Sequence, residues 1–145
     1  MASDHAGIAL RDKIREHITQ RGHEIVDVGP VEADSVDYPD YAVQVASRVA
    51  AGEFDRGILV CGTGLGMQIA ANKVPGTRAI TPYDAATARL SREHNDANVA
   101  CFGGRIQDHD EVLKLAGIWL ETEFAGGRHE QRVAKITAIE KRHSQ

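Results

Sequence analysis

The sequence contains 145 residues with a mass of 15.7 kDa, which fits a single domain over residues 1–145 and leaves little room for a second. Hydrophobic residues make up 42% and charged residues 26%, and the absence of a bilayer-spanning apolar run or a signal-peptide pattern argues against a membrane partner. A net charge of -4 argues against a general nucleic-acid partner, and two cysteines without a CxxC pairing, Cys61 and Cys101, fit a reducing compartment. We therefore expect a cytoplasmic protein.

Helical and strand-like patterns alternate along the chain. Apolar residues recur every three or four positions where we expect helices, whereas short apolar or alternating β-branched runs indicate strands. In chain order the pattern predicts a helix over 8–18, a strand over 23–29, a helix over 41–51, a strand over 57–61, a helix over 67–73, a strand over 78–81, a helix over 85–93, a strand over 99–102, and helices over 110–123 and 130–142. This alternation predicts an α/β fold, with a Rossmann-like parallel sheet in a three-layer α/β/α arrangement and ligands at the carboxyl ends of the strands.

The beginning of the chain departs from this plan. An α/β domain normally opens with a strand, but only Met1 and Ala2 precede Ser3, and the first helical pattern follows almost at once. The fold is therefore expected to lack most of its first strand, either because the strand is absent or because the true N-terminus lies upstream.

A glycine-rich turn, Cys61-Gly-Thr-Gly-Leu-Gly66, joins a predicted buried strand to a helix. Its glycines permit positive φ values and let a ligand approach the backbone, and its amide groups point into one space, which is typical of an anion-binding nest. A cysteine at the rim of such a nest should be partly thiolate at neutral pH, and the Thr63 hydroxyl can donate to a developing oxyanion.

The spacing of this turn excludes three familiar motifs. The third glycine falls one residue too early for the dinucleotide fingerprint, and the Gly-Lys-Ser/Thr of a Walker A loop is missing. A cysteine phosphatase would have an arginine where this chain has Met67. The structural alternative is that the glycines only permit tight packing and that Cys61 is a small buried hydrophobe. Cys101 lies inside an apolar strand, where core packing is the better interpretation.

Two polar pairs stand at the ends of predicted helices. Asp4 and His5 precede the first helix, where helix capping with an exposed histidine is the alternative to a functional role. His94 and Asn95 end a helix just before a strand. The histidine can act as a general acid or base, or it can simply complement the helix dipole, with Asn95 as a cap.

A basic cluster lies near the end of the chain. Arg105 follows two glycines at a strand end, and Arg128, His129 and Arg132 open the final helix. Residues 128 and 132 share one helix face, so the two guanidinium groups suit a phosphate, although a solvated surface is the alternative. No His, Asp or Glu pair has metal-ligand spacing, so we expect no metal site.

Six motifs follow one another in the order found in a known family. They are Ser3-Asp-His-Ala-Gly7, Asp37-Tyr-Pro39, Cys61-Gly-Thr-Gly-Leu-Gly66, Ala70-Ala-Asn-Lys73, Arg92-Glu-His-Asn-Asp-Ala-Asn98 and Gly126-Gly-Arg-His129. The sequence resembles ribose-5-phosphate isomerase type B, in the family that also holds galactose-6-phosphate and allose-6-phosphate isomerases. The resemblance covers essentially the whole chain.

The resemblance implies an aldose–ketose isomerase without metal or cofactor, which interconverts D-ribose 5-phosphate and D-ribulose 5-phosphate through a cis-enediolate. It implies that Cys61 is the base between C1 and C2, that Thr63 helps to bind the enediolate oxyanion, and that His94 opens the furanose ring. The turn residues implied to bind the oxyanion are Gly62, Gly64, Leu65 and Gly66. The other implied substrate-binding residues are Asp4 and Asn95 at sugar oxygens, Tyr38 as a pocket wall, and His5, Arg105, Arg128 and Arg132 around the phosphate with His129 nearby.

The resemblance also implies a homodimer with shared active sites, in which His94 and Asn95 come from the neighbouring subunit. Whether dimers pair further into a tetramer stays open. Some relatives lack the cysteine and use a glutamate six residues further on. That position is Met67 here, which assigns the sequence to the cysteine branch.

One feature departs from the family pattern. Relatives carry a strand of about six residues before the Asp-His motif, and parallel-sheet geometry places that strand inside the sheet. This chain has only Met1 and Ala2 there. We therefore predict a mis-assigned start codon or a truncated chain, with an unfilled strand position beside Ile25 and poor stability.

Two other functions remain open from the sequence. The first is the same isomerisation of a six-carbon sugar phosphate, which is allose 6-phosphate or galactose 6-phosphate. The length of the pocket decides between this substrate and ribose 5-phosphate. A non-catalytic phosphate- or flavin-binding module would also use a glycine-rich turn at a sheet end, but Cys61, His94 and the arginine pair would then have no role.

Overall fold

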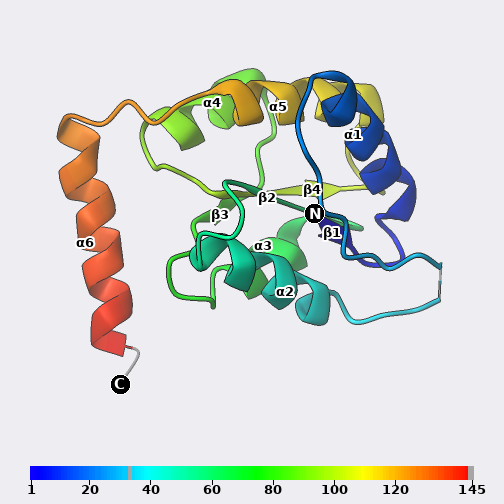
Figure 1. The fold of residues 1–145 in the computed structure, drawn as a ribbon, viewed down its shortest axis with the longest axis horizontal. Helices are drawn as coiled ribbons and strands as arrows, with labels where there is room; N and C mark the ends of the chain where they lie inside the picture. The colour runs from blue at the N-terminus through cyan, green and yellow to red at the C-terminus, as the bar shows by residue number, and fades with distance from the viewer. Residues whose placement is uncertain (33, 144–145) are drawn as a thin grey trace.

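The computed structural model describes residues 1–32 and 34–143, and this part of the chain forms four parallel strands and six helices (Figure 1). In chain order these are β1 (Ala2–Ser3), α1 (Ile8–Gln20), α2 (Tyr38–Ala50), β2 (Gly57–Cys61), α3 (Leu65–Ala71), β3 (Ala79–Ile80), α4 (Ala85–Glu93), β4 (Val99–Gly103), α5 (His109–Glu121) and α6 (Arg128–His143). The strand order in the sheet is β1-β2-β4-β3. The predicted α/β fold with a parallel sheet is confirmed.

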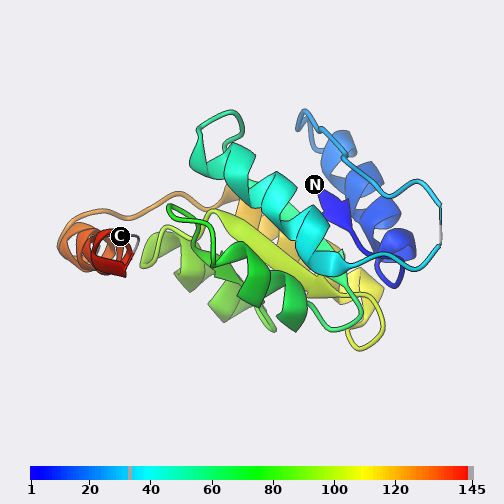
Figure 2. The same cartoon turned by 90° about the horizontal axis from the view of Figure 1, so that it is seen from below.

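Helices cover both faces of this sheet, as Figures 1 and 2 show from two sides. α2 and α3 pack together on one face, whereas α1, α4 and α5 pack on the other. The two central strands, β2 and β4, pair along their whole length, with Gly57 opposite Val99 and Cys61 opposite Gly103. Both strands are buried throughout, which explains why their sequences are continuously apolar rather than alternating.

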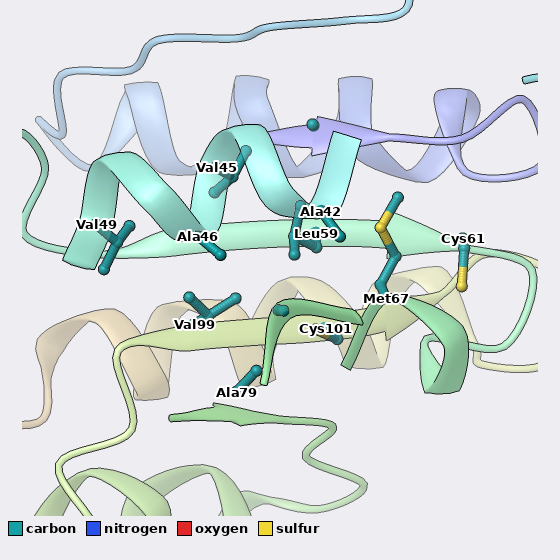
Figure 3. Close-up of a cluster of buried hydrophobic side chains, with 12 residues drawn as sticks. Ala42, Val45, Ala46, Val49, Leu59, Cys61, Met67, Ala79, Val99 and Cys101 are labelled. Atoms are coloured by element: carbon teal, nitrogen blue, oxygen red, sulfur yellow. The ribbon is translucent and has the colours of Figure 1, made fainter. Parts of the chain in front are cut away.

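The hydrophobic core has two parts, one on each face of the sheet. Trp119 and Phe102 belong to the part beneath α1, α4 and α5. The part beneath α2 and α3 contains Cys61, Met67 and Cys101, which Figure 3 shows on one side of the sheet. Complete burial raises the pKa of the Cys101 thiol well above its usual range, so this side chain stays protonated. The interpretation of Cys101 as a packing residue is therefore confirmed.

The last helix, α6, lies on neither face of the sheet and stands beside the body of the domain (Figure 1). An extended segment over 122–127 leads to it, and the Ala125 N–H donates to the Glu93 carbonyl at 3.1 Å. Further along the helix, a Glu140 carboxylate oxygen accepts the Gly76 N–H at 3.0 Å. No helix within the described residues combines the length and the apolar character needed to cross a membrane.

The strand predicted over 23–29 is wrong. This segment is extended and bonds to the first residues of the chain, because the Val28 N–H donates to the Met1 carbonyl at 2.9 Å and the Ser3 N–H donates to the Gly29 carbonyl at 3.0 Å. Its neighbour β1 has only two residues, however, so the two segments cannot build a regular ladder.

A cavity of about 650 Å³ opens beside this segment, at the amino end of β1. Its apolar lining residues include Met1, Ile18, Ile25, Val26, Val28, Val45, Phe54, Ile58 and Leu120. Ala2 and Ser3 pair with Leu59 and Val60 only, so the edge of β2 at Gly57 and Ile58 has no strand beside it on this side within the described chain. The unfilled strand position expected near Ile25 is thereby confirmed, whereas poor stability remains a prediction.

Candidate active site

The carboxyl end of β2 enters α3 through a tight glycine-rich turn. Cys61 is only 4% exposed, and its Sγ accepts a hydrogen bond from the Gly64 N–H at 3.1 Å. Gly64 is the N-cap of α3 and has a φ of 80°, and an added Cβ would lie 3.0 Å from the carbonyl carbon of Phe102. Only glycine fits this position, and its conformation directs a backbone N–H at the cysteine sulfur. The expected close approach of turn amides and cysteine is confirmed at this point.

The segment that follows β4 lies directly against this turn. The Gly104 N–H donates to the Cys61 carbonyl at 2.8 Å, and the Arg105 N–H donates to the Gly62 carbonyl at 3.0 Å. The Arg105 side chain passes over Gly62, where its Cδ lies 3.4 Å from the position of an added Cβ. Two glycine-rich strand ends therefore hold an exposed guanidinium group beside the cysteine turn.

Asp4 reaches the same end of the sheet from β1. Its N–H donates to the Val60 carbonyl at 2.9 Å, and its Oδ1 accepts the N–H groups of Ala6 at 2.9 Å and Gly7 at 3.1 Å. Asp4 therefore stabilises the turn that precedes α1. The helix itself has Gly7 as its N-cap and no side-chain cap, so the capping alternative is wrong. Only Oδ1 takes part in these bonds, so the second carboxylate oxygen is available to a ligand.

Tyr38 lies against the glycine-rich turn, and His5 contacts the loop that leads to α2. The Nδ1 atom of His5 accepts the N–H of Val36 at 3.3 Å, so the histidine ties the start of α1 to the loop before α2. The ring of Tyr38, at the first position of α2, lies over Gly66, where an added Cβ would meet ring carbons at 2.8 Å. Gly66 is therefore needed for the close approach of this ring.

The second group of predicted residues surrounds the end of α4 and the start of α6. His94 follows the last residue of α4, and its ring stacks on the His129 ring with centroids 4.1 Å apart and planes inclined by 14°. Arg128 and Arg132 stand one turn apart on α6, and both are exposed, as is Asn95.

Three residues to which the sequence analysis gave no role fix the loop that carries Asn95. Asp96 has a φ of 47°, and its two carboxylate oxygens accept hydrogen bonds of 2.9 Å from Arg92 and from Arg78. The Arg78 Nε donates to the Asn95 carbonyl at 3.1 Å. Arg92 is 1% exposed, and burial lowers the pKa of its guanidinium group. The only sequence signal was the density of charged residues around His94.

The predicted site residues form two groups at opposite ends of the sheet. Cys61 and Arg105 lie where the strands end, whereas His94 precedes β4 and lies where the strands begin. The length of β4 between them is about 13 Å at roughly 3.3 Å per residue. Cys61 and His94 therefore do not meet within one chain, and the implied supply of His94 and Asn95 by a neighbouring subunit stays a prediction. The two residues are separated because α4 runs back across the sheet, which carries its last residue to the opposite edge.

Within residues 1–32 and 34–143, no three or more His, Cys, Asp or Glu side chains are grouped so that they could hold a metal ion.

Comparisons with known proteins point to one family. A model of the Ribose/Galactose Isomerase family matches residues 1–136. Ribose-5-phosphate isomerase B of Escherichia coli K12 is 48% identical over 141 residues, which cover 97% of this chain and 95% of the relative.

Solved structures also resemble this chain in sequence and in fold. A ribose-5-phosphate isomerase B of Clostridium thermocellum is 50% identical with a TM-score of 0.96, covering 99% of this chain and 97% of the other. A Mycoplasma genitalium ribose-5-phosphate isomerase B solved with bound ribulose-5-phosphate is 43% identical with a TM-score of 0.92. The match covers 97% of this chain and 93% of the other.

Fold, turn and comparisons together define an α/β isomerase. More particularly, the chain belongs to the ribose/galactose isomerase family.

Proposed function

We propose that this chain interconverts D-ribose 5-phosphate and D-ribulose 5-phosphate. The observation that carries the proposal is the turn from Cys61 to Gly66, which brings a cysteine sulfur and backbone N–H groups together at a strand end. The Mycoplasma genitalium relative with bound ribulose-5-phosphate supports this choice of substrate. The reaction would belong to the pentose phosphate pathway in the cytoplasm, where two unpaired, buried cysteines stay reduced.

Cys61 is the base in the proposed reaction. As a thiolate it removes the proton from C2 of the open-chain aldose, whereupon the C–H electron pair forms the C1–C2 double bond and the carbonyl oxygen becomes an oxyanion. The sulfur then returns the proton to C1, while the hydroxyl proton at C2 passes to the oxygen at C1 and leaves the ketose carbonyl at C2. A positioned base of this kind contributes about 10²–10⁴-fold to the rate.

The turn supplies donors for the oxyanion. The proposed donors are the N–H groups of Gly62 and Gly66 and the hydroxyl of Thr63, because the Gly64 N–H already donates to the Cys61 sulfur. The Thr63 Oγ1 accepts the Leu65 N–H at 3.3 Å, which leaves the hydroxyl proton available to the substrate. Fixed donors aimed at the developing charge stabilise the enediolate more than the starting aldehyde.

Ring opening precedes this proton transfer, because the aldose is mainly a furanose. We assign it to His94, which can take the proton of the anomeric hydroxyl and deliver a proton to the ring oxygen as the bond between that oxygen and C1 breaks. The free carboxylate oxygen of Asp4 and the amide of Asn95 would hold sugar oxygens during this step.

The basic residues would bind the phosphate group. Arg128 and Arg132 share one face of α6, so their guanidinium groups can grip phosphate oxygens together, with His129 between them in sequence. Arg105 and His5 would contribute from the cysteine half of the site, and Tyr38, whose ring covers Gly66, would be a wall of the pocket. A phosphate held remotely from the reacting carbons orients them against Cys61.

A second copy of the chain would complete the site. One chain separates Cys61 and His94 by the length of the sheet, so a homodimer must bring the cysteine half of one copy to the histidine half of the other. Two apolar side chains one turn apart on α3, Leu65 and Ile69, are 56% and 63% exposed beside the Cys61 turn. An exposed apolar face at that position suits contact with the second copy.

The second candidate is the same isomerisation of a six-carbon sugar phosphate. The family description names galactose beside ribose, and the catalytic groups proposed above are equally suited to both chain lengths. A panel of ribose 5-phosphate, allose 6-phosphate and galactose 6-phosphate separates the two candidates by their kcat/KM values.

The direct test is ribulose 5-phosphate formation from ribose 5-phosphate by the unmodified chain, Cys61→Ala and Cys101→Ala. Cys101 is the matched control, because it lies in the same core cluster and is fully buried. We expect Cys61→Ala to lower kcat by about 10²–10⁴-fold. Cys101→Ala should keep most of the activity and lose about 1 kcal/mol of unfolding free energy.

Two results would contradict the proposal. A folded Cys61→Ala protein with undiminished activity would remove the cysteine from its role. An unmodified, folded protein inactive on all three sugar phosphates would overturn the isomerase assignment for this chain.

A further inference from the structure

The stacked histidine pair joins two elements that otherwise touch little. His94 belongs to the end of α4 and His129 to the first turn of α6. Their centroids lie 4.1 Å apart with nearly parallel planes. His129 is 7% exposed although the residues on either side of it are exposed, so its ring is the part of this turn that packs against the body.

Charged groups surround this pair from both elements. Arg128 and Arg132 approach His129 from α6, and Glu93 approaches from α4. Burial lowers the pKa of His129, the neighbouring charges of His94, Arg128 and Arg132 lower it further, and Glu93 opposes them. These influences favour the uncharged form of the His129 ring.

Resting on the isomerase activity proposed above, we propose that His129 is a positioning residue for ring opening, which acts through the imidazole of His94. The stacked ring fixes the plane of His94, so that one nitrogen can reach the anomeric hydroxyl and then the ring oxygen. During the step His94 holds the hydroxyl proton as imidazolium, and the ring oxygen receives a proton as its bond to C1 breaks. No oxidation or reduction occurs.

The uncharged state of His129 is central to this role. A neutral aromatic ring stacked at 4.1 Å accepts a transient imidazolium beside it, because its face attracts a cation. A protonated His129 would repel that imidazolium at the same distance. Ring opening should therefore fail at acidic pH, once His129 becomes charged.

Two variants and two reactions test this proposal. His129→Phe keeps a ring that can stack but cannot be protonated, whereas His129→Ala removes the ring. Isomerisation of ribose 5-phosphate requires ring opening. Exchange of the C1 hydrogen of ribulose 5-phosphate with deuterated water, followed by NMR, requires only the proton transfer at Cys61, because this ketose phosphate is an open chain.

We expect His129→Ala to lower the kcat of isomerisation about tenfold, which is several times more than it lowers the exchange rate. His129→Phe should restore most of the isomerisation, and the acidic limb of its kcat profile should move to lower pH because no second charge forms beside His94. Circular dichroism of both variants separates these effects from a loss of folding.

Equal losses of isomerisation and exchange in folded His129→Ala would overturn the proposal, since the residue would then serve substrate binding alone. A His129→Phe protein as impaired as His129→Ala, or with an unmoved acidic limb, would also overturn it. An unmodified chain that catalyses neither reaction would instead overturn the proposed function, so the two failures are distinguishable.

Discussion

Gly64 shows how closely one residue ties backbone conformation to chemistry. Its positive φ lets the chain reverse from β2 into α3, and its N–H meets the Cys61 sulfur. The space that a side chain would need is occupied by the backbone of Phe102 in β4. Because Phe102 belongs to a central strand, it cannot move aside without disturbing the sheet.

Gly64→Ala and Gly52→Ala form a matched pair for this claim. Gly52 has a similar φ of 75°, but nothing lies within 4 Å of its added Cβ. Gly52→Ala should therefore show backbone strain alone, about 1 kcal/mol of unfolding free energy. Gly64→Ala adds a clash with a strand and should cost about 2–4 kcal/mol, together with most of the activity. Urea unfolding of both variants measures the difference, and equal midpoints would refute the assigned contact.

At the scale of elements, β1 pairs with β2 only at Leu59 and Val60. The cavity at its amino end lies between the edge of β2 and the extended segment over 23–29. The Met1 α-amino group donates to the Val26 carbonyl at the mouth of this cavity. Burial lowers the pKa of this amino group to about 6, from 8.0 for an exposed group.

This lowered pKa fixes the sign of a pH effect on stability. Between pH 6 and 8 the unfolded chain binds more protons at Met1 than the folded chain does. The free energy of unfolding should therefore rise with pH across this window. Urea unfolding at intervals over the window measures this slope.

Extending the chain tests the cavity itself. Val-Ile-Val placed before Met1 should continue β1 between β2 and the segment over 23–29, whereas Gly-Ser-Gly of the same length serves as the control. Each buried side chain contributes about 1.5–3 kcal/mol, and ordering each residue costs about 1.5 kcal/mol, so we expect a net gain of about 2 kcal/mol. That corresponds to a melting temperature roughly 5 °C higher. The extension should also remove most of the slope between pH 6 and 8, because it carries the ammonium group out of the cavity.

An apolar extension that melts no higher than the Gly-Ser-Gly control would contradict this account of the cavity. It would mean that the space beside Ile25 does not accept a strand.

Helices and strands could be predicted from the sequence wherever a local residue pattern alone determines the type of element. β2 and β4 were predictable because apolar runs bounded by glycines suit central parallel strands. The strand predicted over 23–29 failed because strand formation depends on a neighbour, and β1 offers only two residues. The alternation of side chains in that segment is real, but alternation does not report how long the adjacent strand is.

The candidate site also has features that the sequence could predict and features that it could not. The turn at Cys61 could be predicted, because its glycines, threonine and cysteine are contiguous in sequence. The bonds of Asp96 to Arg78 and Arg92 could not, since they depend on how three separate segments meet. The stacking of His94 on His129 was equally hidden, because the path of the segment over 122–127 decides where α6 begins.

At the scale of the whole molecule, the separation of Cys61 from His94 is the central feature. In the proposed reaction, the proton-transfer residue Cys61 lies at the carboxyl edge of the sheet, and the ring-opening residue His94 lies at the amino edge. The proposed reaction needs both residues around one small sugar phosphate. The Cys61 edge of one copy must therefore meet the His94 edge of the other, which gives the proposed dimer two composite sites.

Mixing two inactive variants tests this claim most directly. Cys61→Ala and His94→Ala, unfolded together and refolded, form mixed dimers in which one site carries both substitutions and the other carries neither. Random pairing should restore about one quarter of the unmodified activity, because half of the dimers contain one intact site out of two. The control mixture of His94→Ala with Asn95→Ala should restore none, since both substitutions lie in the same half. Full exchange of subunits with no recovered activity in the first mixture would contradict the shared site.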